Sequence, residues 1–171
     1  MENSILEIVT YTSEHQPWFE KFNRDWIEQY FWMEPIDIEV LQKPEETIIK
    51  KGGEIFMALY EKEMVGTVAL KFVEPGIYEF TKMAVDEKFR GKKIGEMLAQ
   101  VAIQHAKHHK AKKIILYSST KLGPAISLYR KLGFTEVPLD GVYKRSDIKM
   151  EMSLSPKRKL TSVARGVISF L

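Results

Sequence analysis

Residues 78–100, YEFTKMAVDEKFRGKKIGEMLAQ, decide how the rest of the chain is arranged. The first eight, Tyr78 to Val85, place apolar residues as a β-strand does. A charged, glycine-bearing turn follows, and apolar residues then recur at helical spacing from Ile94 onward. The sequence therefore predicts a strand that runs through a basic turn into a long helix.

The turn before this helix has the properties of an anion site. The first N–H groups of a helix have no partner inside it, and the helix dipole adds partial positive charge at that end. Lysine and arginine side chains add full charges, and glycines let a ligand approach the backbone. We expect a phosphate group to be bound here, with an ordinary solvated turn as the alternative. The residues concerned are Arg90, Gly91, Lys92, Lys93, Ile94 and Gly95.

A second motif, AISLYRKLGF, follows at 125–134. Together with MAVDEKFRGKKIG at 83–95, it resembles the GNAT superfamily of N-acetyltransferases, and the resemblance extends over roughly residues 4–154. The family's phosphate loop, Arg/Gln-x-x-Gly-x-Gly/Ala, is matched from Arg90 to Gly95 except that Lys93 replaces the central glycine. A side chain there crowds the backbone's approach to pyrophosphate, although its ammonium can itself meet a phosphate oxygen.

The resemblance implies an α+β (mixed α/β) fold. It has a central, mostly antiparallel, twisted sheet of six or seven strands with one parallel, splayed pair, flanked by about four helices. The chain's own patterns agree, because hydrophobic runs with turn signals between them predict strands. The expected strands are 4–11, 54–60, 64–73, 77–85, 113–118, 134–137 and 147–154. Since a helix separates 78–85 from 113–118, these two should be parallel.

Composition limits the remaining possibilities. The 171 residues are 44% hydrophobic and 29% charged with a net charge of +3, which indicates a globular protein and gives little reason to expect nucleic acid. There is no cysteine, so a covalent acyl-cysteine intermediate is excluded. No signal peptide or membrane helix is expected, and the predicted location is the cytoplasm. We expect one domain at 1–154 and an extension at 155–171 that packs, swaps in a homodimer, or is flexible.

The resemblance also implies acetyl-CoA as the cosubstrate. Backbone groups of Met83, Ala84 and Val85 would hold the pantetheine arm, and Ala125 and Tyr129 would lie beside the coenzyme. The asparagine that many members place before the second motif is Leu122 here, so its contact is absent or is supplied by Ser119 or Thr120.

Two residues are candidates for proton transfer. By resemblance, Glu79 is the general base, while a surface glutamate paired with a lysine is the alternative. Tyr129 matches the family tyrosine that protonates the coenzyme sulfur, and a phenol with an ordinary pKa near 10 suits a thiolate leaving group. The alternative for Tyr129 is a half-buried structural tyrosine.

Aromatic residues mark the first helix, which is expected to begin near Pro17. Trp18, Phe22 and Trp26 form a stripe that predicts core packing. The helix should end before Pro35. In the family this region lines the acceptor pocket, so the predicted substrate-binding residues are Tyr30, Trp32 and Glu34, with a packed loop as the alternative.

Three histidines at His105, His108 and His109 have a spacing that can seat a metal on one helix face. Neighbouring lysines favour a solvated helix end instead, so we expect no metal. The predicted function is transfer of an acetyl group from acetyl-CoA to a primary amine of a small molecule or peptide, by direct attack in a ternary complex. A non-catalytic acyl-CoA-binding module, or less readily a nucleic-acid-binding protein, would be the alternative.

Overall fold

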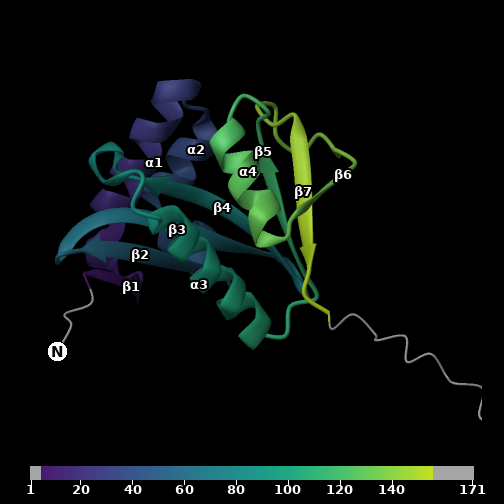
Figure 1. Ribbon diagram of the computed structural model, residues 1–171, viewed down its shortest axis with the longest axis horizontal. Coiled ribbons are helices and arrows are strands. Elements are labelled where there is room, and N and C mark those ends of the chain that lie inside the picture. The colour runs from purple at the N-terminus through teal and green to yellow at the C-terminus, as the bar shows by residue number, and fades with distance from the viewer. Residues whose placement is uncertain (1–4, 156–171) are drawn as a thin grey trace, which may run out of the picture.

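The computed structural model describes residues 5–155 of the chain (Figure 1). This part contains seven strands, four α-helices and three short helical turns. The strands are β1 Leu6–Thr10, β2 Glu54–Tyr60, β3 Glu63–Glu74, β4 Ile77–Val85, β5 Lys113–Ser118, β6 Thr135–Val137 and β7 Ile148–Ser153. The α-helices are α1 Gln16–Tyr30, α2 Pro35–Gln42, α3 Ile94–His108 and α4 Gly123–Leu132. The short turns are Ser13–His15, Glu45–Ile49 and Glu87–Phe89.

All seven strands form one sheet in the order β1-β2-β3-β4-β5-β7-β6. Every neighbouring pair is antiparallel except β4 and β5, which run parallel and are joined through α3. This is the mixed α+β architecture that the sequence predicted, including its one parallel pair. Residues 155–171, predicted to pack, swap or be flexible, lie outside the described residues apart from Ser155, and the domain boundary at 154 stays a prediction.

Helices cover both faces of the sheet. Because successive side chains of a strand point to opposite faces, the core consists of two clusters, one on each side of the sheet. Phe56 of β2 and Leu70 of β3 face the layer that holds α3 and α4. Met57 and Ala69, the neighbouring residues in each strand, face α1 and α2. Figure 1 shows α3 and α4 together on the near side, with α1 and α2 beyond the sheet.

The prediction that Trp18 packs in the core is wrong, because its side chain is 43% exposed. The buried face of α1 follows Phe19, Asn23 and Ile27, each four residues from the next. Each residue of this line follows a residue of the aromatic stripe by one position, and successive residues point about 100° apart around a helix. Phe22 belongs to the aromatic stripe and lies next to the buried line, and its side chain is buried, as predicted.

The parallel strands β4 and β5 separate partway along their length. Their pairing runs from Ile77↔Lys113 to Phe80↔Leu116 and includes no later residue. A register shift at Lys82 and Met83 interrupts the pairing of β4 with β3 nearby, and Lys82 adopts a left-handed backbone with φ 53°. The bulge bends β4 away from β5, so the second half of β4 is not paired with β5 on that edge.

Candidate active site

The basic turn and the first turn of α3 adopt the geometry of an anion site. Gly91 (φ 79°) and Lys93 (φ 61°) both have left-handed backbones, and Lys93 is the residue that precedes α3. This conformation explains why the related loops carry glycine at the position of Lys93, since glycine takes a positive φ without steric cost. Lys93 therefore keeps the expected loop shape at the expense of local strain.

A groove of about 410 Å³ lies between this turn and the start of α4. Its lining includes Val85, Arg90, Gly91, Lys93, Gly95 and Ala125. Arg90 and Lys93 bring positive charge to the groove, and the unpaired N–H groups that begin α3 lie at the same place. The groove thus offers both backbone donors and full charges to a phosphate.

A second cavity, of about 370 Å³, lies on the other side of the separated strands. The end of α1, α2, the middle of β4, the end of β5 and the loop between β6 and β7 contribute to its lining. Met83 of β4 lines this cavity, whereas Val85, two residues later, lines the groove. The unpaired half of β4 therefore connects the cavity with the groove.

Glu79 is buried at one side of the cavity with 5% of its surface exposed. The Tyr143 hydroxyl donates a hydrogen bond of 3.0 Å to its Oε2 atom. Burial raises the pKa of Glu79, and the opposing effects of Tyr143, Lys71 and Lys82 do not cancel that rise. A carboxylate with a raised pKa in a cavity is a suitable proton acceptor near neutral pH.

Tyr129 of α4 also lines the cavity, and its ring contacts Phe80, the last residue of β4 that pairs with β5. Its ring packs edge-on against Phe80 and Phe134, with centroids 5.8 and 6.0 Å away. Burial raises the pKa of Tyr129 to about 12. The phenol is therefore protonated at any pH where the protein would work, as a proton donor must be.

The structure separates the predicted coenzyme-binding residues into groups. Seven of them line the groove, namely Val85, Arg90, Gly91, Lys93, Ile94, Gly95 and Ala125. Met83, Ser119 and Tyr129 line the cavity. Ala84, Lys92 and Thr120 line neither space: Ala84 is buried, Lys92 lies over the Tyr60 ring, and Thr120 bonds to Asp147. The coenzyme-binding roles of all thirteen residues stay predictions.

Of the predicted substrate-binding residues, only Glu34 lines the cavity. Tyr30 and Trp32 are 45% and 64% exposed and lie outside the lining. Trp32 nevertheless contributes its backbone, since its carbonyl oxygen accepts a hydrogen bond of 2.6 Å from Arg145. Any role of these two side chains in substrate binding stays a prediction.

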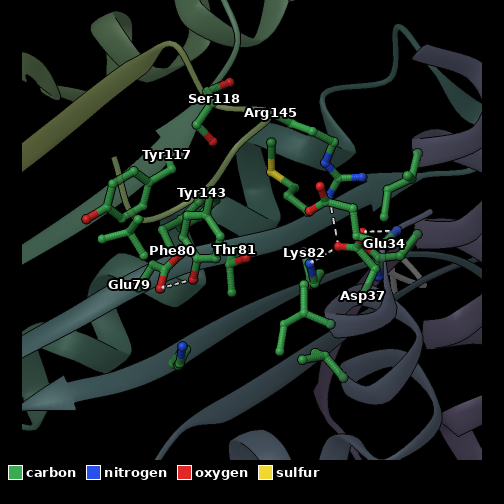
Figure 2. Close-up of a pocket in the computed structure, with 18 of the residues that line it drawn as sticks. Glu34, Asp37, Glu79, Phe80, Thr81, Lys82, Tyr117, Ser118, Tyr143 and Arg145 are labelled. Atoms are coloured by element: carbon green, nitrogen blue, oxygen red, sulfur yellow. Dashed lines mark hydrogen bonds and ion pairs between the residues drawn. The ribbon is translucent and has the colours of Figure 1, made fainter. Parts of the chain in front are cut away.

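Several cavity residues were not singled out from the sequence. Asp37 of α2, Lys82 in the bulge of β4, and Tyr143 and Arg145 in the β6–β7 loop meet around the cavity (Figure 2). Tyr117 at the end of β5 supports Tyr143, with ring centroids 5.0 Å apart. They come from four separate segments with no common motif, so the sequence carried no signal that could have brought them together.

The histidines of α3 do not meet in the way a metal site requires. Within residues 5–155, no group of three or more potential ligands is placed to hold a metal ion. His105 packs edge-on against Phe56, and burial lowers its pKa. In the same part of the chain, no helix combines the length and apolar character needed to cross a membrane.

Residues 11–134 match the Acetyltransferase (GNAT) family. Because the match covers most of the chain, the protein belongs to the GNAT family of acetyltransferases. Both motifs by which the sequence resembled this family lie against the groove, within or at the end of the matched segment.

Curated relatives match over about half of the chain. A mycothiol acetyltransferase of Corynebacterium glutamicum is 30% identical over 95 residues, which is 56% of this chain and 32% of that protein. The N-acetylaspartate synthetase of Mus musculus is 32% identical over 92 residues, or 53% of this chain and 31% of that protein. The match thus spans about a third of the length of these relatives.

Solved structures share the fold over nearly their whole length. An acetyltransferase of the GNAT family from Staphylococcus aureus aligns with a TM-score of 0.80 at 21% identity, covering 87% of this chain and 99% of that one. The PaiA N-acetyltransferase of Thermoplasma acidophilum, solved in complex with coenzyme A, aligns with a TM-score of 0.69 at 20% identity over 86% and 98%. At these identities the likeness concerns the fold.

Proposed function

We propose that the protein transfers an acetyl group from acetyl-CoA to the primary amine of a small molecule or peptide. The observation that carries this proposal is the arrangement of two spaces along β4. A basic groove at the start of α3 suits the pyrophosphate, and a cavity with a buried carboxylate and a buried phenol suits the reacting groups. The arm of the coenzyme would lie along the unpaired edge of β4 between them.

In the proposed reaction, the amine nitrogen attacks the thioester carbonyl carbon and the C–S bond breaks. Glu79, directly or through a water molecule, takes the proton that the amine loses. Tyr129 donates its proton to the departing thiolate, and the resulting phenolate is then reprotonated from solvent while Glu79 releases its proton to solvent. Backbone N–H groups on the unpaired edge of β4 would stabilise the negative charge on the carbonyl oxygen. The products are an N-acetyl amine and free coenzyme A.

The names of the curated relatives point to different acceptors. A thiol-release screen with acetyl-CoA against amino acids, polyamines, aminoglycosides and peptide N-termini tests the proposal. Release that depends on the amine, with the acetylated product seen by mass spectrometry, supports it. Acetyl-CoA binding in calorimetry without thiol release on any amine would instead favour a non-catalytic acyl-CoA-binding module.

A further inference from the structure

The side of the cavity away from Glu79 contains two cations around one carboxylate (Figure 2). Asp37 Oδ1 accepts from Arg145 Nη2 at 2.8 Å and from Lys82 Nζ at 3.3 Å. The other oxygen of Asp37 accepts the Glu34 backbone N–H at 2.9 Å. Burial alone would raise the pKa of Asp37. The Glu34 N–H and the two cations together lower it by more, so the net pKa is below its ordinary value and the carboxylate is ionised at neutral pH.

Each cation is fixed by more than its ion pair. Lys82 belongs to the bulge of β4, where its left-handed backbone directs the side chain toward α2. Arg145 donates a second hydrogen bond to the Trp32 carbonyl oxygen at 2.6 Å and lies over the ring of Phe31, 5.8 Å from its centroid. The two side chains are therefore held in place before any substrate arrives.

Asp37 neutralises only one of these two charges. The side chains of Lys82 and Arg145 are each 18% exposed, and both line the cavity. Lysine has three N–H donors and arginine five, and the hydrogen bonds within residues 5–155 use one and two of them. Glu34 and Glu39 also line the cavity, but within the described residues neither forms an ion pair with Lys82 or Arg145, and Lys51 and Lys71 add two further cations to the lining. A positive charge with spare donors is thus left in a partly enclosed space, where a matching anion would be stabilising.

The loop between β6 and β7 contributes a residue to each of these two sides of the cavity. Tyr143 contacts Glu79, and Arg145, two residues later, contacts Asp37. The Cα atoms of two such residues are at most about 7 Å apart. One short loop therefore holds the proton acceptor and the cationic pair on two sides of the same cavity.

We infer that Lys82 and Arg145 form a subsite for an anionic group of the acceptor, and that the acceptor is a small amine that also carries a carboxylate, as an amino acid does. This inference rests on the proposed acetyl transfer. The amine would lie at Glu79, and the carboxylate would receive hydrogen bonds from the planar guanidinium and the ammonium. A polyamine, with a second positive charge in place of the carboxylate, would be repelled from the subsite.

The test compares matched acceptors on the unmodified protein. Thiol release is measured with acetyl-CoA and L-amino acids, and with the carboxamides of the same amino acids, which keep the amine and lose the negative charge. We expect kcat/KM for the acid to exceed that for the carboxamide by about 10- to 100-fold, the value of hydrogen bonds to a charged group. Equal use of the carboxamides, or preferential use of spermidine, would overturn the inference while leaving acetyl transfer intact.

Substitutions then locate the effect. Arg145→Gln and Lys82→Gln should each reduce the ratio of kcat/KM between acid and carboxamide toward one, mainly through a higher KM for the acid. The matched control is Arg24→Gln, which removes the same charge from the outer surface of α1, where Arg24 pairs with Glu20. A ratio unchanged in Arg145→Gln and Lys82→Gln would contradict the assignment. Because the ratio is internal to each variant, partial loss of folded protein does not affect it.

Two further arms separate the other outcomes. O-phosphoethanolamine replaces the carboxylate by a phosphate, and its preferential use would support the subsite with phosphate as its anion. Calorimetry of the protein saturated with coenzyme A, titrated with the same amino acids and carboxamides, measures the subsite without turnover. If no amine in the wider screen of amino acids, polyamines, aminoglycosides and peptide N-termini releases thiol, the proposed function fails. Stronger binding of the acids in calorimetry would then still support the subsite, and equal binding would reject it.

Discussion

The hydroxyl of Tyr143 and the carboxylate of Glu79 are joined by a hydrogen bond of 3.0 Å, although 64 residues separate them in the chain. Tyr117 supports the Tyr143 ring and in turn donates a 2.8 Å hydrogen bond to Asp140. The proposed base is thus oriented by a loop that is itself fixed to the end of β5.

Tyr143→Phe should shift the pH dependence of acetyl transfer. The Tyr143 hydrogen bond lowers the pKa of Glu79 against the larger, raising effect of burial, so its removal raises that pKa further. A base works only when deprotonated, and the acidic limb of log kcat/KM should therefore move to higher pH. Profiles of both proteins between pH 5 and 9 measure the shift. Glu79→Gln should abolish this limb, and superimposable profiles for Tyr143→Phe would show that the hydroxyl does not act on the base.

Tyr129→Phe should lower kcat by about 100-fold or more, because the thiolate would leave without a positioned proton donor. The aromatic ring stays, so packing against Phe80 and Phe134 is kept and acetyl-CoA should bind as before. Single-turnover thiol release measures the chemical step, and calorimetry with acetyl-CoA is the control. Turnover like that of the unmodified protein would remove Tyr129 from the mechanism.

Substitutions of Lys93 should reveal the strain in the phosphate loop. Its φ of 61° is unfavourable for any residue with a Cβ atom but not for glycine. Lys93→Gly should therefore be more stable than Lys93→Ala by about 1 kcal/mol in urea unfolding, while both lose the ammonium. The alanine variant is the matched control for charge. Equal stability of the two would mean that the loop does not hold the left-handed backbone.

Asp37→Asn should destabilise the protein at neutral pH by about 3 kcal/mol, because two partly buried cations lose their shared carboxylate. The pKa of Asp37 is lowered in the folded state, so its contribution is present above the unfolded pKa of about 4 and is lost as the pH falls through the folded pKa. Urea unfolding at pH 7 and at lower pH should show the difference between the two proteins shrinking on acidification. A difference independent of pH would show that the asparagine acts through packing alone.

Much of the fold could be predicted because its signals are local. The strands 54–60, 77–85 and 113–118 were predicted with the bounds that the structure has. Each is a run of apolar and β-branched residues that ends at polar or glycine-containing turns. The parallel pairing of β4 and β5 followed from the intervening helix. The error at Trp18 arose because two neighbouring lines on α1 both carry large apolar side chains, and only contact with the sheet decides which one is buried.

The sequence by itself determined the strand, basic turn and helix, and with them one wall of the groove, because the residues of that wall lie close together in the chain between Val85 and Glu96. The fold adds the other wall, from the start of α4. Only the tertiary structure decided the side of the cavity that holds the cationic pair. There Asp37, Lys82 and Arg145 come from three distant segments, and nothing in their spacing records that they meet. The physical reason is that the β-bulge and the β6–β7 loop orient these side chains through long-range packing, and the charge they leave unbalanced exists only once the segments are together.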